Sequence, residues 1–197
     1  MDTKKLTFVI MMGALGNGLF VISYAVGQIA PGVALDLSLL AVFIAGIYAG
    51  PKAGFATGLI AGIIPGIMFG PAGTGGILGL LALPFGKGLT GLTVGLLATG
   101  LCLNSRPHKA LIGIPVTLLA YIPEGIFTYA YFTALLPYFF NQFIPDFIVS
   151  GIMIKAAIEV AIMSGIIAVL LRNKAFNNFI SAYFCKTKTT KNQTIKQ

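Results

Sequence analysis

Residues 46–70 read GIYAGPKAGFATGLIAGIIPGIMFG, and a glycine stands at every fourth position from Gly46 to Gly70. Almost all of the residues between these glycines are apolar, which is not typical of a loop. Because residues four apart lie on the same face of a helix, the spacing predicts a groove along which another backbone can approach closely. A glycine inside a helix costs about 0.5–1 kcal/mol relative to alanine, whereas in lipid the close packing of small residues itself promotes helix association. We therefore interpret the stretch as two membrane helices that meet at a tight cytoplasmic turn, Gly50-Pro51-Lys52.

The composition of the whole chain also indicates a membrane protein. Of its 197 residues, 57% are hydrophobic and 9% are charged, and the mean hydropathy is +0.93, whereas about 25% of a soluble domain is charged. The formal net charge of +8 does not predict a nucleic-acid partner, because the basic residues are not grouped with aromatic residues in a patch. Cys102 and Cys185 have no second cysteine at metal-ligand spacing, so we expect neither a disulfide nor a metal site. The predicted fold is an all-α membrane bundle over residues 1–175, followed by a polar basic tail at 176–197.

Six apolar segments are long enough to be read as transmembrane helices. Pro and Gly residues, a polar loop at 104–109 and the aromatic segment PYFFNQFIP at 137–145 separate them, and Pro65 predicts a kink inside the third. The tail is expected to lack order beyond about residue 186, because its composition is polar. The predicted spans are 6–28, 33–49, 53–69, 77–101, 110–136 and 146–171.

The distribution of Lys and Arg predicts which side of the membrane each loop occupies. Apart from Lys87 and Lys155, which fall inside spans, all of the 13 Lys and Arg residues lie before the first span, in the second and fourth loops, or after the last span. The other three loops have none. Loops rich in Lys and Arg stay on the cytoplasmic side, so the six-span topology predicts that both termini are cytoplasmic.

Four charged residues interrupt the spans near their centres, namely Lys87, Glu124, Lys155 and Glu159. A charge at the bilayer centre costs about 2.5–3.5 kcal/mol on insertion scales, so these side chains are expected to face the bundle interior and to have partners. One interpretation is two internal ion pairs that fix the helix register, with Lys155 and Glu159 paired one turn apart on the same helix. The other is a small-ligand pocket between the fourth, fifth and sixth spans. Asp36 is expected at the outer mouth of the bundle, where water solvates its carboxylate.

The aromatic segment 137–145 lies on the predicted outer side. Tyr138 and Phe139 are candidates for stacking on a planar ligand ring, and an interfacial aromatic belt explains them equally well. The candidate ligand-binding residues are Lys155, Lys87, Glu124, Glu159, Asp36, Tyr138, Phe139 and Asn141.

Motifs of familiar catalytic and metal-binding chemistry are missing from the sequence. Gly86-Lys87-Gly88 is similar to the end of a nucleotide phosphate loop, but Leu81 stands where that loop needs a glycine and Gly88 where it needs Ser or Thr. Neither HExxH nor GxSxG occurs. We therefore expect no enzymatic activity, no cofactor and no metal, and the energy for any active transport must come from another protein.

Two segments are similar to parts of one known family. Residues 34–62 read ALDLSLLAVFIAGIYAGPKAGFATGLIAG, and residues 144–171 read IPDFIVSGIMIKAAIEVAIMSGIIAVLL. The first resembles the second and third helices, and the second resembles the last helix with its Ile-Lys pair, of substrate-binding S components of energy-coupling factor (ECF) vitamin transporters. Within that family the LDLS and IK segments are most similar to riboflavin-binding members, and GPAGTGGILG at 70–79 is most similar to biotin-binding members.

The resemblance implies the substrate-capture subunit of a cell-membrane importer for a water-soluble vitamin such as riboflavin or biotin. Its partners would be membrane lipid, an ECF transmembrane coupling protein and two cytoplasmic ATPase subunits, and the S component would tilt in the membrane to carry its ligand across. The family's docking motif on the first helix is represented here by Ala14-Leu15-Gly16-Asn17-Gly18. The residues expected to dock the partner are Ala14, Gly18, Gly54, Gly58 and Gly62.

Two other functions fit the same residues. One is a stand-alone secondary transporter or facilitator of a small metabolite, in which Lys155 and Glu159 relay protons or ions. The other is a membrane enzyme or assembly factor that uses Lys87 and Glu124.

Overall fold

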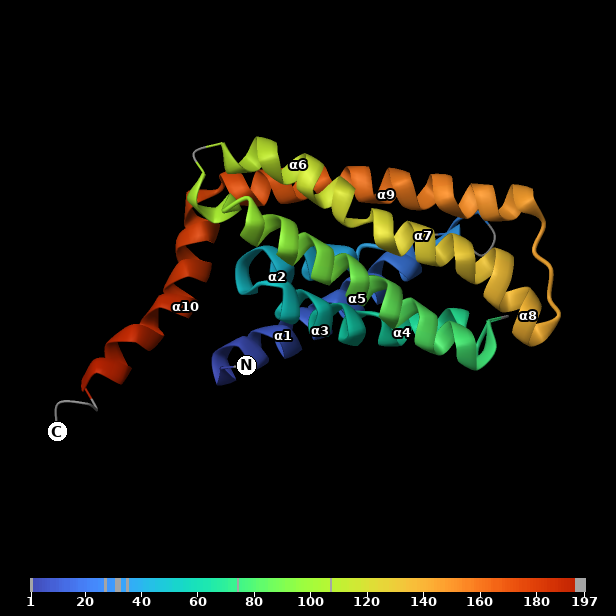
Figure 1. The fold of residues 1–197 in the computed structure, drawn as a ribbon, viewed down its shortest axis with the longest axis horizontal. Coiled ribbons are helices and arrows are strands. Elements are labelled where there is room, and N and C mark those ends of the chain that lie inside the picture. Colours follow the sequence, from blue (N-terminus) through green and yellow to red (C-terminus); the bar gives the residue numbers. More distant parts are fainter. Residues whose placement is uncertain are drawn as a thin grey trace.

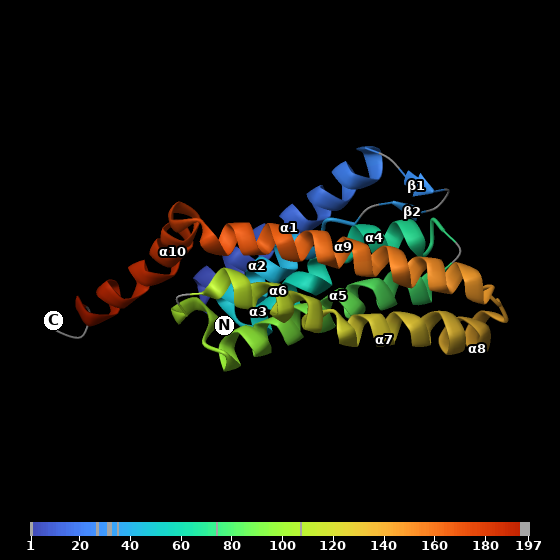
Figure 2. The same ribbon diagram turned by 90° about the horizontal axis from the view of Figure 1, so that it is seen from above.

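The structure, a computed structural model, describes residues 2–26, 28–30, 33–34, 36–73, 75–106 and 108–193. Helices form nearly all of this part of the chain and make a bundle that is elongated in both views (Figure 1 and Figure 2), which confirms the all-α fold class. A short antiparallel pair of strands links the first two helices. The elements are α1 (Thr3–Val26), β1 (Gln28–Ala30), β2 (Val33–Ala34), α2 (Leu39–Ala49), α3 (Pro51–Ala61), α4 (Ile63–Phe69), α5 (Gly76–Gly100), the 3-10 turn η1 (Leu103–Ser105), α6 (Lys109–Ala120), α7 (Ile122–Ala130), the π-helical turn η2 (Tyr131–Leu135), α8 (Leu136–Phe140), α9 (Asp146–Arg172) and α10 (Lys174–Gln193).

Five helical stretches of the described chain are long and apolar enough to cross a membrane. Their outward-facing side chains are largely apolar; Ile77 and Leu111, for example, are each 71% exposed. Such surfaces are unfavourable in water and favourable against lipid tails, so the bundle has the architecture of a multi-pass membrane protein. The stretches are Thr3–Val26, Pro51–Phe69, Gly76–Gly100, Lys109–Phe140 and Asp146–Arg172.

The helix in the predicted span at 33–49 is clearly shorter in the structure than the sequence predicted. Its helix, α2, begins only at Leu39 and has 11 residues, which at 1.5 Å per residue is about 16 Å, against a hydrocarbon core of about 30 Å. The helix starts late because the Asp36 carboxylate accepts hydrogen bonds from both the backbone N–H and the hydroxyl of Ser38, which forms a turn. Nearly every residue of α2 is buried, so this short helix lies in the centre of the bundle.

The glycine stripe of α3 and α4 packs against α5 inside the protein. A Cβ atom at Gly54 would lie 2.2 Å from the carbonyl oxygen of Gly91, one at Gly58 would lie 2.3 Å from that of Lys87, and one at Gly62 would lie 2.3 Å from Pro84 Cα. Backbone meets backbone along this line, as the spacing predicted. The prediction that Gly54, Gly58 and Gly62 dock a partner protein is wrong, because α5 of the same chain already covers them.

Helix α1 places its small residues on two opposite faces. Gly13 and Gly16 are buried against α3, where added Cβ atoms would meet Ile60 and Ala61 at 2.5 and 2.7 Å. Ala14 and Gly18 point the other way and are exposed, and a Cβ atom at Gly18 would meet nothing within 4 Å. Of the predicted docking residues, these two are therefore free to contact a partner.

Asn17 ties α1 to the break between α3 and α4. This break is at Gly62, three residues before Pro65, close to where the sequence predicted a kink. The Asn17 amide donates to the carbonyl of Ile60 at 2.7 Å and accepts from the backbone N–H of Ile64 at 3.1 Å. The two backbone groups freed by the break therefore have a side-chain partner.

Two segments are more helical than the sequence predicted. Helix α8 continues the fifth span to Phe140, so only residues 141–145 of the predicted aromatic turn are non-helical. Pro137 is tolerated because it lies in the first turn of α8, directly after the π-helical turn. The polar tail forms α10 to Gln193, and its start is held by Asn177, whose Oδ1 accepts hydrogen bonds from Tyr48 and Lys109, each at 2.7 Å.

Candidate binding cavity

A cavity of about 350 Å³ lies between α5, α7, α9 and the turn before α2. Its volume is at the lower end of the range for small-molecule sites, about 300–1,000 Å³. Gly79 and Gly86 of α5 line one wall and leave room because they have no side chains. The cavity reaches Gly75 and Ile144, which belong to the α4–α5 turn and to the link between α8 and α9. It therefore lies toward the end of the bundle that has no basic loop residues.

Lys87 is one of the most deeply buried side chains, with 1% of its surface exposed. Its ammonium donates to the Asp36 carboxylate and to the hydroxyl of Ser38. The sequence predicted that Lys87 is buried and has a partner, but it placed Asp36 in water at the outer mouth. That placement is wrong, because Asp36 is turned inward as the counter-ion of Lys87 and contributes to the cavity wall.

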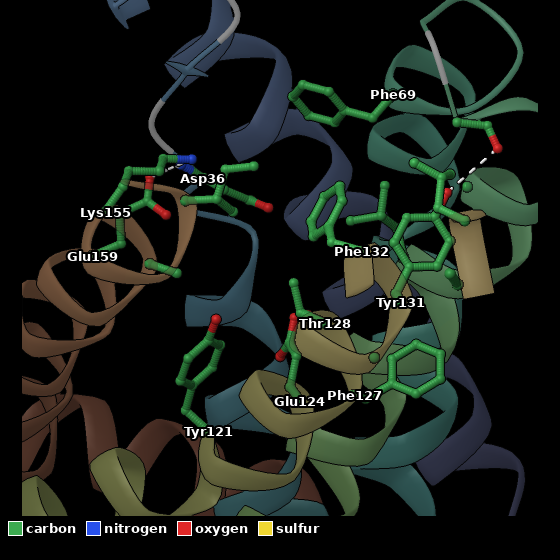
Figure 3. Close-up of a pocket in the computed structure, with 18 of the residues that line it drawn as sticks. Asp36, Phe69, Tyr121, Glu124, Phe127, Thr128, Tyr131, Phe132, Lys155 and Glu159 are labelled. Atoms are coloured by element: carbon green, nitrogen blue, oxygen red, sulfur yellow. Dashed lines mark hydrogen bonds and ion pairs between the residues drawn. The ribbon is translucent and has the colours of Figure 1, made fainter. Parts of the chain in front are cut away.

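Lys155 and Glu159 of α9 form the ion pair that their spacing predicted, with the ammonium 3.1 Å from the carboxylate. The same oxygen of Glu159 accepts the backbone N–H of Asp36 at 2.7 Å. Both side chains line the cavity, and Figure 3 shows them beside Asp36 on one side of it. One continuous polar network therefore connects α9, the turn before α2, and α5.

Glu124 of α7 has no such ionic partner. It is 8% exposed, and its Oε2 accepts a hydrogen bond from the hydroxyl of Thr90 on α5. Within the described residues no Lys or Arg lies at ion-pair distance from it. Two ion pairs that consume all four mid-span charges are therefore not formed, since Lys87 pairs with Asp36 instead.

The predicted aromatic residues lie outside the cavity. Tyr138 and Phe139 on α8 are 83% and 60% exposed and pack edge to face on each other with ring centroids 5.1 Å apart. Asn141 ends α8 in the left-handed backbone conformation and is also exposed. None of the three lines the cavity, so a role for them in binding stays a prediction that this geometry does not favour.

A different set of aromatic side chains surrounds the cavity. Tyr121, Phe127 and Tyr131 come from the α6–α8 stretch, Phe132 follows them, and Phe69 closes the far side (Figure 3). None of these five residues was among the ligand-binding residues predicted from the sequence. A helical pattern was available to find them, because positions 121, 124, 128 and 131 share one face, and that face carries Glu124.

Comparisons with protein-family models, with characterised proteins and with solved structures give no match. Support for a binding site therefore comes from the geometry of this chain alone. Among the described residues no three His, Cys, Asp or Glu side chains gather at metal-binding distance. Cys102 is exposed, whereas the side chain of Cys185 lies outside the described part.

Proposed function

We propose that this chain is the substrate-capture subunit of an ECF-type importer for a small water-soluble vitamin. The observation that carries the proposal is the cavity, which combines aromatic walls with buried charges inside a bundle of membrane type. A buried charge in such a bundle is expensive and is therefore a sign of function. The resemblance of residues 34–62 and 144–171 to S components supports the same conclusion, because α2, α3 and α9 all contribute to the site or to its support.

The proposed topology has six passes with both termini in the cytoplasm. In Figure 1 the start of α1, the α5–α6 connection and the α9–α10 junction lie at one end, whereas the α4–α5 turn and the α8–α9 link lie at the other. Lys4, Lys5, Arg106, Lys109 and Arg172 belong to the first end. The positive-inside rule then makes this end cytoplasmic. The cavity faces the opposite side, from which an imported ligand arrives.

The proposed partners are an ECF transmembrane coupling protein and two ATPase subunits. The surface proposed for docking is the outer face of α1, where Ala14 and Gly18 are exposed four residues apart. Small residues at this spacing let a partner helix come close in lipid. The glycines of α3 have no part in this contact, since α5 covers them.

Two measurements on the full chain test the proposal. Purification in mild detergent followed by mass spectrometry of the bound small molecules should yield one water-soluble compound in near-stoichiometric amount. Co-purification from the native membrane should yield ATPase subunits, and Gly18→Leu should reduce their recovery while the bound compound remains. Absence of both the compound and the ATPase subunits would contradict the proposal.

The unpaired Glu124 favours a second candidate, a secondary transporter that moves its substrate together with a cation or a proton. Glu124 would then be the coupling group, in place of the predicted relay through Lys155 and Glu159. Uptake by proteoliposomes that contain this chain alone, driven by an imposed ion or pH gradient, would support this candidate over the ECF proposal.

A further inference from the structure

The buried charges around the cavity do not balance. Two lysines, Lys87 and Lys155, face three carboxylates, those of Asp36, Glu124 and Glu159. The two ion pairs use both lysines, so one formal negative charge is left, and it belongs to Glu124. An unpaired ionised carboxylate in a low-dielectric interior is strongly unfavourable. The charge of Glu124 must therefore be balanced either by a proton on its carboxyl group or by a bound cation.

The carboxylate of Glu124 is directed at the cavity. It lines the cavity wall, and Figure 3 shows it beside Thr128, between Tyr121 and Phe127. Its Oε2 takes the hydrogen bond from Thr90, whereas its Oε1 has no hydrogen-bond partner among the described residues. Gly86 of α5 lies opposite this oxygen, and a Cβ atom added at Gly86 would lie 3.7 Å from Oε1. A nine-tenths-buried acceptor thus remains open toward the space that a ligand would fill.

The shape and walls of the cavity favour an organic cation over a metal ion. A space of about 350 Å³ is much larger than a metal site needs, and no group of three metal-ligating side chains is present in the described chain. Aromatic faces attract cations, and Tyr121 and Phe127 lie on either side of Glu124, whereas Tyr131 lies farther along the cavity wall (Figure 3). These rings also suit a flat heterocycle, which they can contact face to face or edge to face.

We infer that the ligand is an aromatic organic cation, such as a protonated or quaternised nitrogen heterocycle, whose positive charge is matched by Glu124. This inference rests on the proposed substrate-capture function and specifies the chemical class of the substrate. Lys155 is neutralised by Glu159 and therefore does not repel such a ligand, and Lys87 is enclosed by Asp36 and Ser38. A vitamin whose only charge is a carboxylate would instead place a second anion beside Glu124.

The test uses one ring in three charge states. The full chain in detergent is dialysed against 1-methylnicotinamide, nicotinamide and nicotinate, which are cationic, neutral and anionic, and against thiamine as a larger aromatic cation. We expect the cationic probes to bind at least about tenfold more tightly than the neutral one, and nicotinate not to bind. Glu124→Gln should remove this preference, whereas Asp146→Asn, an exposed acid on α9 outside the cavity, should leave it intact.

The possible results distinguish failure of the charge inference from failure of the proposed capture function. If a neutral or anionic compound binds most tightly, or if the compound purified with the protein is an anion, the inference is overturned and the capture function stands. If sodium or potassium ions alone stabilise the protein and no organic probe is preferred, the inference is also overturned. If no probe binds and no compound co-purifies, both fail. The charge preference is measured on the unmodified chain, so it decides the question even if Glu124→Gln does not fold.

Discussion

Lys87 connects two parts of the molecule that are distant in the sequence, α5 and the turn before α2. Its ammonium holds Asp36 and Ser38, about 50 residues before it, against the middle of α5. We predict that Lys87→Met lowers the free energy of unfolding by about 3–5 kcal/mol, because the Asp36 carboxylate is left without its cation in an apolar setting. The double change Lys87→Met with Asp36→Asn should recover most of the loss. Melting followed by circular dichroism in detergent measures both effects.

The result for Lys87 would also decide where Asp36 lies. An unchanged melting midpoint in Lys87→Met would mean that water solvates Asp36, as the sequence alone suggested. Lys155→Met is the matched comparison, and we expect a smaller loss, since Lys155 is 22% exposed and Glu159 keeps its hydrogen bond from the Asp36 backbone.

Asn17 carries a second residue-scale prediction. Asn17→Ala leaves the carbonyl of Ile60 and the N–H of Ile64 without their partner at the α3–α4 break. A buried backbone group without a hydrogen bond costs about 1–3 kcal/mol, so the melting midpoint should fall clearly. Leu15→Ala is the control, because Leu15 is a neighbour on the exposed face of α1 and its truncation should have little effect. Equal midpoints in the two variants would contradict the bridging role of Asn17.

The contacts of a single residue could be predicted from the sequence where both partners lie in the same helix. The Lys155–Glu159 pair follows from helical spacing alone. The burial of Lys87 follows from its position in an apolar span, but its partner does not, because the Asp36–Ser38 turn brings in a residue from another element. Asn17 gave no signal either, since the groups that it satisfies exist only once the helix breaks at Gly62.

At the scale of elements, the glycine stripe predicts a close helix contact, and the structure identifies the partner as α5. Gly58→Ala should therefore be severely destabilising: its Cβ would lie 2.3 Å from the carbonyl of Lys87, so α3 and α5 must separate. Gly18→Ala is the matched control on an open helix face and should leave stability unchanged or slightly raised. The yield of monodisperse protein in size-exclusion chromatography compares the two. A well-folded Gly58→Ala variant would contradict the tight α3–α5 packing.

The sequence predicts that such a face exists but not what covers it. A period of four residues is the same for a contact within the chain and for a contact with another protein, which explains the error at Gly54, Gly58 and Gly62. The short α2 escaped prediction for a related reason. Hydropathy continues through residues 33–49, and only the side-chain hydrogen bonds of Asp36 show where the helix starts. The five longer stretches were predictable because their length and composition suffice.

For the whole molecule, the number of membrane crossings depends on α2. Helix α2 is only 11 residues long, but it lies between α1 and α3 in the chain, and each of those is part of a stretch long enough to span. If the segment from β1 through α2 completes a crossing, both termini are on one side. If it does not, the N-terminus lies opposite the α5–α6 loop. The short helix therefore decides the topology.

Cysteine labelling from outside the cell separates these two cases. In a background with Cys102→Ser and Cys185→Ser, we expect Gln142→Cys to react with an impermeant maleimide, because residue 142 is exposed in the link on the side without basic residues. Asp2→Cys and Ser105→Cys, which are also exposed, should react only after permeabilisation. If position 2 is labelled from outside and position 105 is not, the chain crosses the membrane five times and not six. If position 105 is labelled from outside, the orientation is the reverse of the proposed one. The cavity would then lie toward the cytoplasmic side, which is incompatible with a subunit that captures its ligand outside the cell.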